Sequence, residues 1–75
     1  MDKREFNKLL ASAKRGDAEA MYLVGLEYES GDSVEADGDK ALEWINDAAD
    51  CGNKDAIAWL KQYYFDDDAS TQSYS

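Results

Sequence analysis

Carboxylates are the side chains of this sequence that come closest to forming a reactive or metal-binding group, because the chain has no histidine. Four of them, Asp32, Glu35, Asp37 and Asp39, follow one another closely, and oxygen-rich clusters of this kind bind Ca²⁺. Their spacing is not that of an EF-hand loop, and the terminal bidentate glutamate of that loop is missing. We therefore expect a solvated acidic loop in which Asp37 caps a helix, with no metal and no cofactor.

The composition contains few of the side chains that nucleophilic catalysis requires. Without histidine the chain lacks the Ser-His and Cys-His pairs, the commonest general base and most zinc sites. The single cysteine, Cys51, lies beside Asp50 at the negative end of a predicted helix, which makes it a poor nucleophile. A lone cysteine forms no internal disulfide and suits a reducing cytoplasm. The sequence predicts a protein that is not an enzyme and has no catalytic residues.

Negative charge is the second informative feature. The 75 residues carry 17 acidic and 8 basic side chains, a formal net charge of -9. Residues 1–15 are the only basic part, whereas the stretch between Glu27 and Asp39 contains six carboxylates and no basic residue. Such a surface repels a phosphate backbone, so we expect no direct nucleic-acid binding. It favours encounter with a basic protein. The candidate acidic contacts are Glu27, Glu29, Asp32, Glu35, Asp37 and Asp39.

Aromatic side chains are numerous for so short a chain. Tyr28, Trp44 and Tyr64 fall on apolar stripes, where side chains pack against neighbouring helices. Tyr22, Trp59 and Tyr63 fall outside the main stripes. Exposed aromatic residues are enriched at the energetic centres of protein interfaces, so these three are candidate partner-binding residues, although packing inside the fold is the alternative.

Helical periodicity accounts for most of the chain. Apolar spacings of three and four residues, an absence of proline and abundant Ala, Leu, Lys, Glu and Asp predict an all-α protein without strands. Glycines 16, 31 and 52 are predicted stops, and Asp17, Asp37 and Asn53 are predicted starts. Val34 should tuck beneath the loop that follows Gly31. The predicted helices are residues 3–15, 18–30, 38–51 and 53–65, in one domain covering residues 1–65, with residues 66–75 as a disordered acidic and polar tail.

Membrane association is not indicated by the hydropathy pattern. The chain has no stretch of even ten uninterrupted apolar residues, and its N-terminus leads into an amphipathic pattern rather than the core of a signal peptide. We expect a cytoplasmic protein without a membrane partner.

An internal repeat organises these helices. The segment 13–20 returns as the segment 49–56, a spacing of 36 residues, which is typical of repeats that stack two helices per unit. Small residues at matching positions would let helices approach closely while larger groups fill the gaps. The predicted packing set is Ala20, Gly25, Tyr28, Ala41, Trp44, Ala48, Gly52, Ala56 and Leu60.

The pattern over residues 18–52 resembles the Sel-one-like repeat family, a relative of the tetratricopeptide repeat. The residues that carry it are Ala18-Glu-Ala20, Val24-Gly25-Leu26, Tyr28, Gly31, Val34, Asp37, Lys40-Ala41-Leu42, Trp44-Ile45, Ala48-Ala49, Gly52 and Ala56. The resemblance implies a short right-handed α/α solenoid of about four helices, one full repeat with flanking half repeats. It also implies an adaptor or scaffold role without catalytic residues.

The second copy departs from this family pattern. Lys61 and Asp67 replace the glycines at positions 25 and 31, so we expect the array to end at the fourth helix. Ile57, Leu60 and Tyr64 would then need a cover, for which the tail, a second copy of the chain and the partner are candidates.

Two functions from different classes remain open at this point. The first is a non-enzymatic binding module, a small acidic inhibitor of a basic partner, such as an immunity protein for a bacterial toxin or a phage inhibitor of a host nucleic-acid-binding defence enzyme. It would act in the bacterial cytoplasm, or in the host cytoplasm if a phage encodes it. The second is a structural adaptor or self-assembling unit, with a possible homodimer through the uncovered C-terminal helix.

Overall fold

The computed structural model describes residues 2–65, and this part of the chain is all helical and contains no strand. Four α-helices are followed by one π-helical turn, η1, and a side-chain cap marks the start of each α-helix. Their bounds are α1 Lys3–Lys14, α2 Ala18–Ser30, α3 Gly38–Asp50, α4 Lys54–Leu60 and η1 Lys61–Phe65. The predicted tail, residues 66–75, lies outside the described residues.

Each α-helix begins at a side chain that accepts a hydrogen bond from the first turn, where backbone N–H groups lack helical partners. Asp17 accepts from the backbone N–H groups of two residues at the start of α2, at 3.1 and 3.3 Å. Asp37 accepts from the N–H of Lys40, and Asn53 accepts from the N–H of Ala56. These three caps confirm the predicted starts. Asp2 caps α1 in the same way, which the periodicity analysis did not predict.

The loop between α2 and α3 starts at Gly31, which adopts a left-handed conformation with φ of +72°. This conformation favours glycine because it has no Cβ. A Cβ at this position would also lie 2.9 Å from the Cβ of Ala36. The backbone N–H of Asp37 then donates to the carbonyl of Tyr28 at 2.9 Å, which closes the loop. Half-buried Val34 packs beneath it against the core, as predicted.

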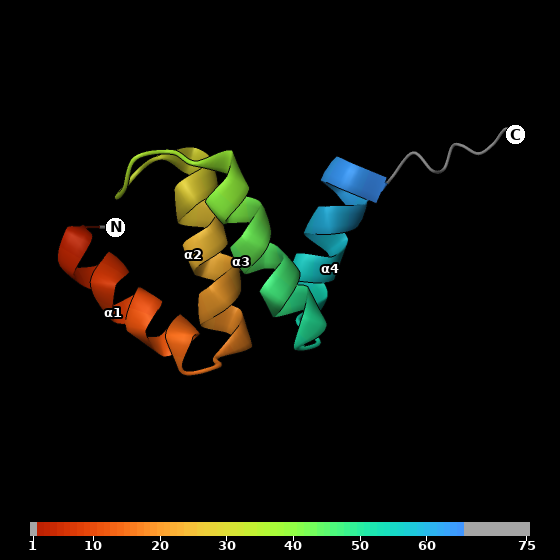
Figure 1. Ribbon diagram of the computed structural model, residues 1–75, viewed down its shortest axis with the longest axis horizontal. Helices are drawn as coiled ribbons and strands as arrows, with labels where there is room; N and C mark the ends of the chain where they lie inside the picture. Colours follow the sequence, from red (N-terminus) through yellow and green to blue (C-terminus); the bar gives the residue numbers. More distant parts are fainter. Residues whose placement is uncertain (1, 66–75) are drawn as a thin grey trace, which may run out of the picture.

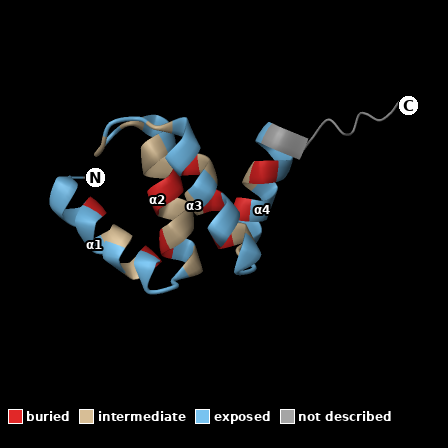
Figure 2. Cartoon of the chain, viewed as in Figure 1, coloured by how far each residue is buried: buried red, intermediate tan, exposed pale blue. Residues whose placement is uncertain are grey.

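Neighbours in sequence are neighbours in space, since each helix contacts the next one along the chain. Figure 1 shows α1 at one end, α2 and α3 side by side in the middle, and α4 at the other end. Buried residues lie on the faces where the helices meet, and exposed residues cover the outside (Figure 2). One cluster joins α1 and α2 around Phe6 and Val24, and a second joins α3 and α4 around Ile45 and Leu60.

Gly25 is where α2 and α3 interlock. A Cβ added there would lie 2.5 Å from Cγ1 of Ile45 and 3.0 Å from the carbonyl oxygen of Ala41. Ile45 is completely buried and fills the space that the glycine leaves. The other predicted packing residues that are buried are Ala20, Ala41, Ala48, Ala56 and Leu60, while Tyr28 and Trp44 are half-buried against the first cluster.

The C-terminal part differs from the prediction in three respects. The α-helical bonding expected to reach residue 65 ends at Leu60, where the wider π turn takes over. Leu60 is 6% exposed because it packs against α3, so it does not belong to an uncovered stripe, whereas Ile57 is 37% exposed. Gly52, placed in the predicted packing set, is exposed with φ of +93°, and a Cβ there would meet nothing within 4 Å. Gly52 therefore contributes through its backbone conformation, with positive φ, rather than through close packing. The side chain of Tyr64 lies outside the described part.

None of the helices in residues 2–65 has both the length and the apolar character needed to cross a bilayer.

Candidate protein-binding surface

The predicted carboxylates gather at one end of the α2–α3 pair because these two helices are antiparallel neighbours. The last turn of α2, the loop 31–37 and the first turn of α3 meet there, at the top of Figure 1. We call this region the acidic end. Its carboxylates are Glu27, Glu29, Asp32, Glu35, Asp37 and Asp39, of which Glu27 and Asp37 are half-buried and the other four exposed. The fold thus concentrates negative charge that the chain distributes over thirteen residues.

Two of the six carboxylates also accept hydrogen bonds that stabilise the local structure. Oε1 of Glu27 accepts a hydrogen bond of 2.6 Å from the hydroxyl of Ser33, which holds the loop against α2. Asp37 is the N-cap of α3. In the acidic end, Glu29, Glu35 and Asp39 present exposed carboxylates without serving as caps.

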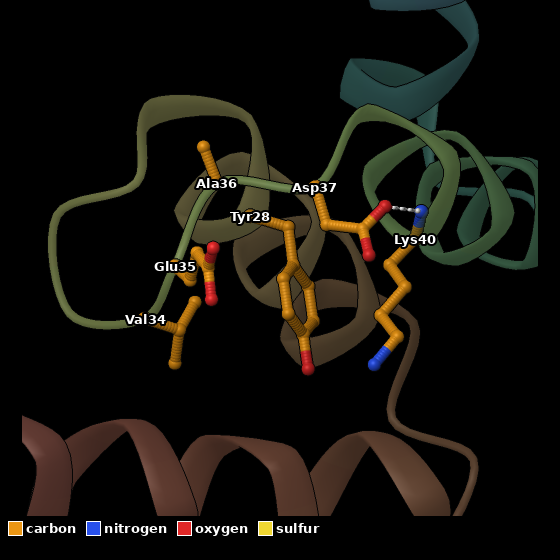
Figure 3. A pocket seen from close by; sticks show the side chains of 6 residues that line it. All are labelled: Tyr28, Val34, Glu35, Ala36, Asp37 and Lys40. Atoms are coloured by element: carbon orange, nitrogen blue, oxygen red, sulfur yellow. Dashed lines mark hydrogen bonds between the residues drawn. The ribbon is translucent and has the colours of Figure 1, made fainter.

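A pocket of about 290 Å³ lies beneath the acidic end, lined by Tyr28, Val34, Glu35, Ala36, Asp37 and Lys40. In Figure 3 the Tyr28 ring and the Lys40 side chain extend side by side toward α1. The ammonium group of Lys40 lies 5.6 Å from the centroid of the Tyr28 ring, a cation–π geometry. Tyr28 also contacts Phe6 edge to face, with centroids 5.6 Å apart. These contacts join α1, α2 and α3, so we interpret this pocket as part of the packing.

The three candidate aromatic anchors form a second region, the aromatic patch, defined by Tyr22 of α2, Trp59 of α4 and Tyr63 of η1. Tyr22 and Trp59 are half-buried against the second core cluster, so both also contribute to the fold. Tyr63 is 58% exposed and stacks on Trp59 in a tilted arrangement, with ring centroids 4.7 Å apart and planes 40° apart. The patch therefore combines two anchored rings with one exposed ring.

The hydroxyl of Tyr22 lies in a negative and partly desolvated environment. Burial raises the pKa of Tyr22 above its usual value of 10.0, and the charges of Asp55 and Tyr63 raise it further. All three effects disfavour the phenolate. Asp55 of α4 and Tyr22 of α2 are therefore near each other, although 33 residues separate them in sequence.

A hydrogen bond links the start of α4 to the first turn of α2. The side-chain amide of Asn53 donates from Nδ2 to the carbonyl of Ala18 at 3.2 Å, while its oxygen caps α4. Asn53 thus ties the first turn of α2 to the start of α4. An aspartate, which caps α2 at the matching repeat position 17, has no N–H to donate and could not make this bond.

In residues 2–65 no three His, Cys, Asp or Glu side chains come close enough together to hold a metal ion. Cys51 is a free, exposed thiol at the C-cap of α3. The arrangement offers charge and aromatic surface, which are means of recognition.

Two residues of this surface were not among the sequence candidates. Lys40, immediately after the acidic stretch, places a positive charge at the border of the acidic end. Asp55 lies four residues before Trp59 and eight before Tyr63, a helical stripe that could have indicated their common face. Its proximity to Tyr22 depends on how α2 and α4 pack.

No family model, curated protein or solved structure matches the chain.

Proposed function

We propose that this protein is a non-enzymatic protein-binding module, an acidic inhibitor that grips a basic partner protein. A toxin neutralised by its immunity protein, or a nucleic-acid-binding defence enzyme blocked by a phage protein, would present such a basic surface. We further propose that its helices form a short right-handed α/α solenoid of the Sel-one-like kind, acting in the cytoplasm of a bacterial cell. The observation that carries the proposal is the acidic end.

Charge is the physical basis of this function. Carboxylates held in fixed positions resemble the phosphates of a nucleic acid, so a cleft lined with arginine and lysine attracts them. The absence of histidine supports a binding role over an enzymatic one. The exposed ring of Tyr63 supports it as well, because aromatic anchors supply much of the energy at protein interfaces.

Capture of the partner from source cells, followed by calorimetry with the purified pair at about 50 and 500 mM salt, tests the proposal. The acidic-end variant combines Glu29→Gln, Glu35→Gln and Asp39→Asn. Its matched control neutralises three exposed carboxylates elsewhere, Glu5, Glu43 and Asp50, so both variants change the formal net charge from -9 to -6.

We expect the wild-type affinity to fall at high salt, and the acidic-end variant to bind more weakly at low salt and with a smaller salt dependence than the control. Equal behaviour of the two variants, or an affinity that does not depend on salt, would contradict the proposed role of the acidic end.

The exposed side chain of Ile57 favours a second candidate function, a structural adaptor or self-assembling unit. This residue lies on α4 and is 37% exposed, so a second copy of the chain could cover it. Sedimentation velocity at several concentrations separates the two functions. A dimer that Ile57→Glu disperses supports assembly, and a monomer at all concentrations supports the binding module.

A further inference from the structure

The aromatic patch has a chemical character that the acidic end does not share. Trp59 supports one side of Tyr63, with ring centroids 4.7 Å apart, while 58% of Tyr63 remains accessible to solvent. A ring held in this way loses little conformational freedom when a ligand stacks on it. Tyr22, packed against the same core cluster as Trp59, extends the aromatic surface onto α2.

Carboxylates share helical faces with these rings. Asp55 shares the α4 stripe of Trp59 and Tyr63 and acts electrostatically on the hydroxyl of Tyr22. On α2, the exposed Glu19 and Glu29 lie three residues before and seven residues after Tyr22, on the same helical face.

The lysines of the same segment follow a different stripe. Lys54 and Lys61 are exposed and seven residues apart, rotated by about 100° around the helix from the stripe that Asp55 begins. The face that combines aromatic rings with carboxylates therefore matches a cation in charge.

We propose that the aromatic patch receives an arginine side chain of the basic partner, which stacks its guanidinium on the exposed ring of Tyr63 while Asp55 balances its charge. The inference rests on the proposed function and assigns one part of the interface to a defined chemistry. Arginine suits this surface better than lysine because its planar guanidinium stacks on aromatic rings and is more weakly hydrated. Aromatic residues paired with arginine are typical energetic centres of protein interfaces.

The probe for the experiment is a blocked pentapeptide of alternating glycine and arginine, compared with versions containing lysine or citrulline. Binding is followed by ¹H–¹⁵N NMR, in which the two tryptophans give separate indole N–H signals. We expect the arginine peptide to shift the signal of Trp59 and the amide of Tyr63. The signal of Trp44, which packs against the other core cluster, serves as the internal control.

Four variants distinguish stacking on the Tyr63 ring from general electrostatic attraction of the arginine peptide. Tyr63→Leu keeps apolar bulk but removes the aromatic face and should weaken arginine binding about two- to fivefold, as expected for one exposed cation–π contact. Tyr63→Phe keeps the ring and should stay within about a factor of two of the wild type. Asp55→Asn should weaken binding more than Asp47→Asn, an equal charge change at a pocket formed by α1, α2 and α3. Because Tyr63 and both aspartates are exposed, we expect all variants to fold, which circular dichroism checks.

Three outcomes would overturn this inference. The first is an arginine peptide that shifts only amides of the acidic end and binds Tyr63→Leu as tightly as the wild type, which would leave the proposed function standing. The second is equal binding of the lysine or citrulline peptide at Tyr63. The third is concentration-dependent self-association that Tyr63→Leu abolishes, since a second copy would then be the occupant of this face. The salt dependence of the affinity for the true partner tests the proposed function separately from this inference.

Discussion

Helices α2 and α3 meet at Gly25, and an alanine there would enter space that Ile45 already fills. The added Cβ would lie 2.5 Å from Cγ1 of Ile45, about 1 Å closer than carbon atoms normally approach. It would also lie 3.0 Å from the carbonyl oxygen of Ala41, which is backbone and cannot rotate away. Ile45 is completely buried, so its side chain has no solvent to move into.

The expected effect is a net loss of stability from two opposing contributions. Overpacking a core costs up to about 3 kcal/mol, and this contact lies at the severe end. Alanine in place of glycine in a helix interior returns about 1 kcal/mol. The difference, about 2 kcal/mol, corresponds to a fall in Tm of about 8 to 16 °C for a domain of this size.

Thermal and urea unfolding followed by circular dichroism at 222 nm measures the effect, with Gly38→Ala as the matched control. Gly38 is the first residue of α3, and a Cβ there would meet nothing within 4 Å. The control should therefore keep its Tm or raise it by a few degrees. If Gly25→Ala melts at or above the wild-type temperature, α2 and α3 do not interlock at this residue, and the packing described above is wrong.

Three further predictions concern the core, the connection between helices and the patch. Ala48→Leu should cost about 1 to 3 kcal/mol in urea unfolding because Ala48 is completely buried, and an unchanged midpoint would mean that this face of α3 is open to solvent. Asn53→Asp keeps the cap but loses the bond to the Ala18 carbonyl and should cost about 1 kcal/mol, whereas Asn53→Ala loses both and should cost about 2; an Asn53→Asp variant as stable as the wild type would show that the bond between helices contributes nothing. For Tyr22, folding raises the pKa, so the unfolded chain loses the tyrosine proton first and stability should fall as the pH rises above 10. Tyr22→Phe should lessen this alkaline loss and remove a tyrosine that ionises at raised pH in absorbance titration at 295 nm, and an identical stability profile would show that Tyr22 ionises normally in the fold.

The parts of the fold that follow from local rules were predictable from the sequence. A cap such as Asp17 acts on the next three residues, and a glycine such as Gly31 acts on its own turn, so both can be recognised without knowing the tertiary structure. The burial of Ala48 followed from helical periodicity. The end of α4 at Leu60 did not, because the periodic pattern continues through the π turn and does not distinguish the two kinds of hydrogen bonding.

Some parts of the candidate surface were likewise predictable from the sequence, and others were not. The carboxylates of the acidic end are close in sequence, and an antiparallel helix pair brings the end of one helix beside the start of the next, so their grouping could be anticipated. The proximity of Tyr22 and Asp55 could not, because it depends on how α2 and α4 each pack against α3. Asn53 links the start of α4 to α2, and its amide donor has no signature in the helical pattern.

The effect of a substitution on binding can be separated from its effect on stability only at residues outside the buried clusters. Tyr22 and Trp59 pack against the second core cluster, and Asp37 caps α3, so substituting any of them changes both stability and surface. Tyr63 and Glu29 are exposed and lie outside the buried clusters. A variant of either residue that keeps its Tm but binds more weakly therefore reports contact with the partner, because the helices that carry both residues remain in place.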